Sequence, residues 1–525
     1  MIITQQFNTN ATKNLARAAY RYLGKDTSFS DLRTKVAKLS YLYLHELGAS
    51  SRVAFVARNS PAYLASFLAL SNCRSVTIPI DPDKPPEEVL KILKDTKATH
   101  IAVTNDMISR VREMLHSVGM NLPLVEIEKK QGGEYSNSFT PPPENPPSDN
   151  DPILIMRTAG TLGTIKYVAF NHKQLIHAAT SLRLNYKLTS NDRFYTHMSW
   201  AHPFAFFHGM LFPLLIGATT VIDHGAEGND LLDFFVESRV TRIIGLPSFF
   251  LKILLICRDE KRRIAAGVKS VTVGLGKLDP AVQKAIGLMQ IAVANCYGLA
   301  EACWTIAMEA VQKEEEAPLR RGGKKVVEEP VIPDTSSGIP VGKGIVGLKY
   351  KVIDDNGDEV PGKDKREGLL CVTGPSIMTK YYENDKESKT TIRGTWLYTN
   401  EFARLEGEGE TLNITFLARR PDGLRSGNEI LTAEAIDKAL KGAPGVTDAA
   451  GFLLKDSRNE TRFACSVVKT PGTALNEKQV LEICGSKLPA NQVPVIATFS
   501  DFIPRDAGGN VIRSKLSAQF SGALG

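Results

Sequence analysis

The sequence predicts an α/β protein with parallel strands and more than one domain. Short apolar runs of strand length alternate with segments of helical periodicity. Such alternation is typical of parallel sheets that are covered by helices. At 525 residues the chain exceeds what one hydrophobic core usually spans, and 43% of its residues are hydrophobic, which suffices to fill two or more cores.

The first hundred residues carry this pattern most clearly. Residues 53–59 and 75–80 are predicted strands, and the segment between them, 61–72, is a predicted helix. A second helix over 87–96 precedes a strand over 100–104. This order of elements predicts a parallel sheet.

Further along the chain, two polar segments interrupt the pattern. Residues 131–151 are rich in proline and indicate a surface connection, whereas residues 312–330 carry mixed charge and indicate an exposed excursion. From about Gly338, short strands with turn signals such as 354–364 indicate a β-rich subdomain. After Arg419 the alternation of helix and strand resumes and continues to the C-terminus.

The composition argues against several classes of function. The net charge of +7 comes from 64 basic and 57 acidic residues in a mixed pattern, which does not indicate nucleic-acid binding. The seven cysteines include no C-x-x-C pair, so we expect reduced thiols in a cytoplasmic protein and neither disulfides nor zinc. No apolar run approaches the roughly 20 residues that span a bilayer.

The N-terminal segment before Asp26 carries only basic charges. This composition resembles that of a transit peptide. Residues 14–24 also suit an ordinary amphipathic opening helix, which is the interpretation that we favour.

A glycine- and threonine-rich loop follows the apolar run 153–157 and indicates a phosphate site. Backbone N–H groups, hydroxyls and one lysine can all donate to an anion there. Gly160, Gly163 and Lys166 are spaced G-x-x-G-x-x-K, which is not the P-loop pattern G-x-x-x-x-G-K-[ST]. The dinucleotide pattern G-x-G-x-x-G is also absent. Taken alone, the loop is equally well explained as a glycine-rich turn.

The segments around this loop resemble those of one enzyme superfamily. Residues 158–168 are similar to the phosphate-binding motif of the AMP-forming adenylating enzymes, which include acyl-CoA synthetases, peptide-synthetase adenylation domains and beetle luciferases. Nine further segments match the same superfamily in order along the chain, namely 59–70, 78–93, 202–222, 240–250, 296–301, 372–384, 395–405, 418–430 and 503–516. The chain is therefore identified as a member by resemblance.

The resemblance implies a fold and a division into domains. Residues 1–418 would form a large N-terminal AMP-binding domain of two α/β subdomains plus a small β-barrel. Residues 419–422 would form a hinge, at which Asp422 lies. Residues 423–525 would form a small, mobile α+β C-terminal domain that rotates between two half-reactions.

The resemblance also assigns residues to ATP and Mg²⁺. Lys166 and its loop would hold the β and γ phosphates, together with Thr158, Gly160, Thr161 and Gly163. Glu301 would help to hold Mg²⁺, and Tyr297 and Gly298 would lie along the adenine. Several positions depart from the superfamily pattern and remove side-chain donors or a turn residue, namely Ala159, Leu162, Ile165, Tyr167 and Ala300.

By the same resemblance, Glu401 and Arg419 would bind the ribose. Glu401 replaces an aspartate but is still a carboxylate with two acceptor oxygens. Asn400 replaces a glycine, and we expect it to disfavour the turn that the glycine makes. Gly427 matches the glycine that borders the pantetheine tunnel in the transfer state, which favours a thiol acceptor.

The segment 199–209 bears on the choice of acid. Peptide-synthetase domains for α-amino acids have an aspartate here, and this segment has none. His202 stands where many acyl-CoA and aryl-CoA ligases have histidine. Trp200, Phe204 and Phe206 suit an apolar or aromatic pocket, and helix packing explains them equally well.

The final motif shows the largest departure. The superfamily places a lysine there that bridges the substrate carboxylate and the α-phosphate, whereas this chain has Asn510. A neutral amide carries no charge, so we expect slow adenylation unless Arg505, Arg513 or Lys515 takes over the role.

The sequence therefore predicts an ATP-dependent, AMP-forming ligase. It would activate a carboxylic acid as its adenylate, with Lys166, Glu301, Asn510 and His202 in catalytic roles. It would then transfer the acyl group to a thiol, either CoA or carrier-protein phosphopantetheine. The alternative is a catalytically weak homologue that binds nucleotide or acyl adenylate as a sensor or scaffold. The sequence does not indicate the oligomeric state.

Overall fold

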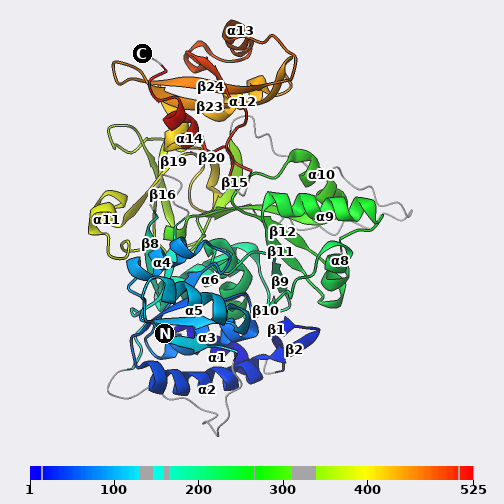
Figure 1. The fold of residues 1–525 in the computed structure, drawn as a ribbon, viewed down its shortest axis with the longest axis vertical. Helices are drawn as coiled ribbons and strands as arrows, with labels where there is room; N and C mark the ends of the chain where they lie inside the picture. The colour runs from blue at the N-terminus through cyan, green and yellow to red at the C-terminus, as the bar shows by residue number, and fades with distance from the viewer. Residues whose placement is uncertain are drawn as a thin grey trace.

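The structure, a computed structural model, describes residues 1–13, 16–128, 146–158, 165–264, 267–309, 338–427, 429–506 and 509–523. It is a mixed α/β protein with a large N-terminal part and a smaller C-terminal part. The C-terminal strands and helices lie at one end of the molecule and α2 at the other (Figure 1). Most of the first polar segment and all of the second fall outside the described ranges.

The first of two large sheets has six strands in the order β6-β5-β3-β4-β7-β8. Its neighbours are parallel except for β7 and β8, which form an antiparallel pair at one edge. The strands are β3 (Arg52–Val56), β4 (Val76–Ile80), β5 (His100–Val103), β6 (Leu124–Glu126), β7 (Pro152–Arg157) and β8 (Tyr167–Asn171). The predicted strands 53–59, 75–80 and 100–104 are therefore confirmed, with shifts at their ends.

The second sheet combines a parallel and an antiparallel half. The parallel half is β1 (Ala18–Tyr22), β9 (Arg193–Thr196), β10 (Thr219–Val221), β11 (Arg242–Gly245), β12 (Ser270–Val273) and β13 (Ala292–Tyr297). The antiparallel half continues from β13 and contains the strands predicted as a β-rich subdomain. It comprises β14 (Ala307–Met308), β15 (Ile339–Gly344), β16 (Lys349–Ile353), β17 (Arg366–Thr373), β18 (Ile392–Arg393), β19 (Trp396–Glu406) and β20 (Asn413–Arg419), while β2 (Lys25–Ser28) pairs with β1.

The helices of the N-terminal part pack in three groups. The largest core joins side chains of both sheets, such as Phe55 and Phe194, to α1 (Ile3–Lys13), α2 (Phe29–Leu47), α3 (Pro61–Asn72), α6 (His172–Tyr186) and α7 (Phe212–Ile216). The other face of the first sheet packs on α4 (Pro86–Asp95) and α5 (Ile108–Ser117). The parallel strands of the second sheet pack on α8 (Gly228–Glu237), α9 (Pro247–Asp259) and α10 (Pro280–Leu288) (Figure 1).

Local sequence explains the helix α3, which is central to this core. Ser60 is its N-cap and accepts from the backbone N–H of Tyr63, and Pro61 occupies the first turn, where no N–H is needed. Almost every α3 residue after Pro61 is buried, which explains why the segment is apolar all round.

The C-terminal part contains a hairpin and a separate sheet. The hairpin is β21 (Gly423–Ser426) with β22 (Glu429–Thr432), and the sheet has the order β23 (Val446–Lys455), β24 (Thr461–Lys469), β25 (Ala497–Phe499). Three helices accompany them, namely α12 (Ala433–Leu440), α13 (Glu477–Lys487) and α14 (Arg513–Gln519). The predicted alternation after Arg419 is confirmed.

The predicted opening helix over residues 14–24 is wrong. The first helix, α1, ends at Lys13, and residues Ala18–Tyr22 form strand β1. This strand pairs in parallel with β10, with Tyr20 opposite Thr220. Sheet pairing outweighs the weak helical pattern here, and the two tyrosines suit a strand. Within the described residues, no helix is long and apolar enough to cross a membrane.

Candidate active site

The hairpin of β7 and β8 places Lys166 at the edge of the first sheet. The backbone N–H of Thr158 donates to the carbonyl of Lys166 at 2.9 Å, and the Lys166 N–H donates to Thr158 Oγ1 at 3.2 Å. These bonds close the base of the glycine-rich loop. Gly160, Thr161 and Gly163, which the sequence assigns to phosphate, lie outside the described residues.

Tyr381 connects Lys166 to Glu301. The Lys166 Nζ lies 4.8 Å from the centre of the Tyr381 ring, and the Tyr381 hydroxyl donates to Glu301 Oε1 at 2.7 Å. The backbone fixes this tyrosine, because Tyr381 forms a bridge with Val168 of β8 and the N–H of Met378 donates to the Glu301 carbonyl at 2.8 Å. Two residues from distant motifs are thus brought to one aromatic ring.

Glu301 follows the carboxyl end of β13, in the short 3₁₀ turn Ala300–Ala302. Binding sites in α/β proteins form at such strand ends. Gly298 lies in the same connection, and a Cβ there would come within 2.4 Å of the backbone carbon of Trp304. Close approach of two backbones therefore explains the glycine at this position.

Glu401 is buried and belongs to a polar group with the half-buried Tyr297 and Arg419. Glu401 on β19 lies directly opposite Arg419 on β20, and the Tyr297 hydroxyl donates to Glu401 Oε2. Only 9% of Glu401 is exposed. Burial raises the pKa of Glu401 to about 7, although the hydrogen bond from Tyr297 and the charge of Arg419 oppose the rise. The carboxyl therefore titrates near neutral pH.

Asn400 adopts the left-handed backbone conformation. Its φ is +59°. Asparagine tolerates this region better than other side chains do, because its short polar group can bond locally. Because this region favours glycine, the structure agrees with the expectation that Asn400 suits the turn less well than a glycine would.

The chain after Arg419 leads into the C-terminal part through the turn Arg420–Asp422. Burial raises the pKa of Asp422, and the charges of Arg513 and Arg419 oppose this rise. Gly427 lies in the turn between β21 and β22 with φ +61°, which favours glycine. Among the described residues, no atom lies within 4 Å of where its Cβ would stand.

Trp200 and Phe206 have different neighbours from His202. Trp200 and Phe206 are fully buried and pack edge-on against Tyr63 and Phe67 of α3, so helix packing explains them. His202 lies beside the ring of Trp304 with 5.3 Å between ring centres.

His202 is held in one orientation. Its Nδ1 accepts from the backbone N–H of Phe204 at 3.1 Å, and burial lowers the pKa of His202 to about 4. Phe204 also packs on Trp304, with 5.9 Å between ring centres. His202 is therefore a neutral imidazole with its proton on Nε2.

Asn510 reaches from the C-terminal part to the second sheet. Its Nδ2 donates to the carbonyl of Leu275, just beyond the end of β12, at 2.9 Å. The same Nδ2 lies 3.2 Å from both carboxylate oxygens of Asp506. Adjacent strands β12 and β13 are parallel, so Asn510 and Glu301 lie beyond the same edge of the sheet.

Two of the cations proposed to replace the missing lysine already have partners. Arg505 pairs with Asp448 at 2.9 Å, and Arg513, 9% exposed, pairs with Asp437 at 2.6 Å. Lys515 is exposed on α14. The two arginines therefore serve the C-terminal fold.

Several residues of this site were not found from the sequence. Tyr381 lies within a matched motif, but nothing in the sequence indicated that it joins Lys166 to Glu301. Trp304 and Asp506 lie within four residues of Glu301 and Asn510 and could have been noticed by proximity alone.

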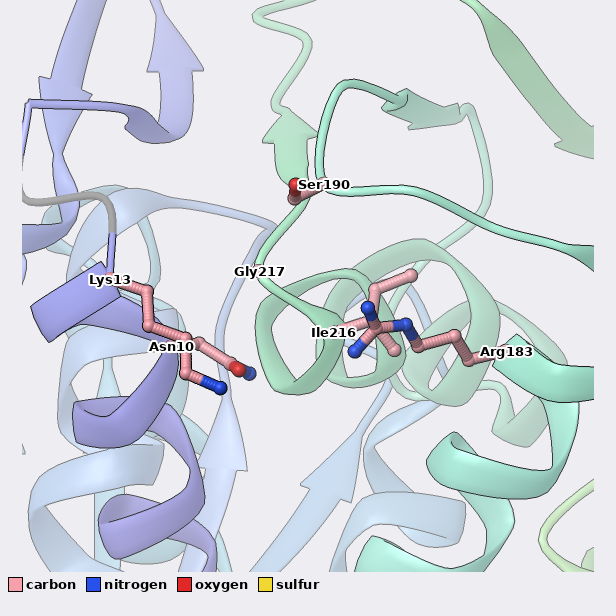
Figure 2. A pocket seen from close by; sticks show the side chains of 6 residues that line it. All are labelled: Asn10, Lys13, Arg183, Ser190, Ile216 and Gly217. Carbon is pink, nitrogen blue, oxygen red and sulfur yellow. The ribbon is translucent and has the colours of Figure 1, made fainter.

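A separate shallow hollow lies beside the ends of α1 and α7 (Figure 2). It shares no residue with the site above. Its lining consists of Asn10, Lys13, Arg183, Ser190, Ile216 and Gly217.

Known proteins resemble this chain over nearly its whole length at low sequence identity. The feruloyl-CoA synthase of an Amycolatopsis species is 22% identical over 504 residues, covering 96% of each chain. The indoleacetate–CoA ligase of Aromatoleum aromaticum is 21% identical over 520 residues, covering 97% of this chain and 96% of the relative. Both similarities extend over nearly the whole chain.

Solved structures share the fold. ATP-bound MatB from Rhodopseudomonas palustris matches with a TM-score of 0.78 at 18% identity over 100% of both chains. The Bacillus subtilis o-succinylbenzoate CoA synthetase MenE, in complex with ATP and magnesium, matches with a TM-score of 0.75 at 18% identity over 97% of this chain and 98% of that one. The family model described as AMP-binding enzyme matches residues 7–382. The chain therefore belongs to the AMP-binding enzyme family, within the AMP-forming adenylating superfamily.

Proposed function

We propose that this protein is an ATP-dependent, AMP-forming ligase that joins a carboxylic acid to a thiol, with CoA as the favoured acceptor. The observation that carries the proposal is the link from Lys166 through Tyr381 to Glu301. This link brings together Lys166, the proposed phosphate ligand, and Glu301, the proposed metal ligand, which lie far apart in the sequence. The two relatives described above match over nearly the whole chain and are named as a CoA synthase and a CoA ligase, which supports the same chemistry.

In the first half-reaction, a carboxylate oxygen would attack the α-phosphorus of ATP and the bond to pyrophosphate would break. Lys166 would neutralise charge on the departing phosphates. Glu401 and Arg419 would fix the ribose and hence the α-phosphate. In the second half-reaction, a thiol sulfur would attack the acyl carbon and AMP would leave.

Glu301 suits Mg²⁺. Magnesium usually takes one or two carboxylates together with substrate phosphates and waters. Tyr381 occupies one carboxylate oxygen of Glu301, Oε1, and orients the group. Among the described residues, no cluster of three or more metal-binding side chains occurs, which fits a metal held largely by nucleotide. When bound, Mg²⁺ would neutralise phosphate charge.

The acid is proposed to be fatty, aryl or related, and not an α-amino acid. The segment 199–209 contains no carboxylate to pair with an ammonium group. His202 is neutral and lies beside Trp304, which suits an uncharged acyl group.

Nucleoside binding should depend on pH through Glu401. Ribose hydroxyls donate best to the ionised carboxylate, and the pKa of Glu401 is about 7. Adenosine does not itself titrate near neutral pH, so we expect its affinity to rise by up to about tenfold between pH 6 and pH 8. Isothermal titration calorimetry at these pH values measures this directly.

The Glu401→Gln variant is the matched control, since it keeps the shape and cannot ionise. Its adenosine affinity should be flat with pH. In the nucleotide-free protein, the free energy of unfolding should instead fall as pH rises. The pKa of Glu401 is raised in the folded state, so the protonated group favours folding, and this stability is lost as pH rises through about 7. A wild-type affinity that does not change between pH 6 and pH 8 would contradict the ribose role.

One observation favours a second function, that of a nucleotide or acyl-adenylate sensor with weak catalysis. Where the superfamily has a lysine, this chain has an amide that already donates to Leu275 and lies beside the carboxylate of Asp506. This arrangement offers no positive charge to an α-phosphate.

An acid-dependent pyrophosphate-exchange assay separates these functions. The panel should contain fatty, aryl and α-amino acids, and Mg-ATP binding should be followed in parallel by the thermal shift of the protein. The ligase proposal predicts exchange with at least one fatty or aryl acid. Binding of ATP without exchange for any acid would favour the sensor. If the protein neither binds Mg-ATP nor catalyses exchange, both the ligase and the sensor proposals are overturned.

A further inference from the structure

The ammonium group of Lys166 has a protein partner as well as an aromatic one. Its Nζ lies 2.8 Å from Glu387 Oε2, and the two side chains are 18% and 41% exposed. The pair therefore lies at the surface of the site, where solvent and ligand can reach the carboxylate. Lys166 lowers the pKa of Glu387, so this carboxylate is ionised at neutral pH.

The position of Glu387 is fixed by the start of α11 (Asp385–Thr391). Its backbone N–H donates to the side chain of the N-cap residue Asn384 at 3.1 Å. Ser388 in the same turn accepts from the N–H of Tyr381 at 2.9 Å. The aromatic and the acidic partner of Lys166 thus belong to one locally bonded segment.

The geometry has a consequence for phosphate binding. The Glu387 carboxylate, 2.8 Å from the Lys166 Nζ, takes one of the three N–H donors of the ammonium group and carries the same sign of charge as a phosphate oxygen. A partly exposed ion pair is weak, so a polyphosphate with several charges can displace it.

We propose that Glu387 competes with the phosphate chain of the nucleotide for Lys166, holding the lysine while the site is free of ligand. This inference rests on the proposed function. Glu387 is a positioning residue, since it acts through Lys166. The competition applies only to ligands that carry the β and γ phosphates. Removing Glu387 should therefore change the affinity for these ligands alone, whereas a general change in protein stability would affect all ligands.

The test is the Glu387→Gln variant, which keeps the size of the side chain and removes its charge. We expect the affinities for Mg-ATP and for inorganic pyrophosphate to increase about two- to fivefold, because exposed ion pairs shift equilibria by this order. The affinity for adenosine should not change. Calorimetric titration of each ligand into the full chain measures all three.

Glu383→Gln is the matched control on the same segment. Glu383 pairs with Lys97 at 2.7 Å, and both are exposed. All three affinities of this variant should equal those of the wild type.

The outcomes separate this inference from the proposed function. If the wild type binds ATP and Glu387→Gln binds it no more tightly, the competition is overturned and the ligase proposal stays intact. An equal gain for adenosine would also overturn it. If the wild type binds neither ATP nor adenosine, the proposed function falls and the inference falls with it.

Discussion

Replacing Lys166 with alanine should lower acid-dependent pyrophosphate exchange by about 10²- to 10³-fold, which is the usual cost of removing one preorganised charge-stabilising group. The structure strengthens this expectation in one respect. Without Lys166, the carboxylate of Glu387, now 2.8 Å from its ammonium group, would face incoming phosphates unpaired. The affinity for Mg-ATP should fall as well, since a charge-assisted contact is lost.

Two further variants make the Lys166 result interpretable. Lys97→Ala removes an exposed lysine that also pairs with a glutamate, Glu383, and should retain full exchange activity. The double variant Lys166→Ala/Glu387→Ala should recover part of the lost ATP affinity, because it removes the unpaired carboxylate. Unchanged exchange and unchanged ATP affinity in Lys166→Ala would show that the loop is only a turn.

Introducing a lysine at position 510 should raise the rate of adenylation by at least about tenfold, because it places a positive charge near the α-phosphate. Transfer from a preformed acyl adenylate to the thiol should change little, since the two half-reactions are expected to use different orientations of the C-terminal domain. Pyrophosphate exchange reports the first step and single-turnover transfer reports the second.

The neighbourhood of Asn510 refines this experiment. Asp506 lies 3.2 Å from the Asn510 Nδ2 and would pair with a new lysine. The double variant Asp506→Asn/Asn510→Lys should therefore adenylate faster than Asn510→Lys alone. Equal adenylation rates in all three proteins would mean that another cation already serves the α-phosphate. If Asn510→Lys accelerates both half-reactions equally, residue 510 does not act in the first half-reaction alone.

Three strands of the first sheet, β3, β4 and β5, could be predicted from the sequence because almost every residue in them is buried. Strand β4, with every residue buried, is apolar except for Thr77, and the helix that precedes it begins at a recognisable cap, Ser60. Strand β1 was missed because its burial is mixed and its pairing partner, β10, lies 200 residues away in the chain. No local signal specifies so distant a pairing.

In the candidate site, too, single residues could be predicted from short motifs, but contacts between distant segments could not. Lys166 and Glu301 could be chosen because each lies within a short motif. Their link through Tyr381 could not, because it depends on a bridge between Val168 and Tyr381 that only the fold creates. The catalytic and binding roles stay predictions.

The central claim, that this chain is an AMP-forming ligase, is tested most directly by identifying its products. The full-length protein should be incubated with Mg-ATP, CoA and the best acid from the exchange screen, and the products should be quantified by liquid chromatography and mass spectrometry. An AMP-forming ligase should yield AMP and acyl-CoA in equal amounts, both dependent on the acid. Formation of ADP in place of AMP, or no acid-dependent AMP from any acid in the panel, would contradict it.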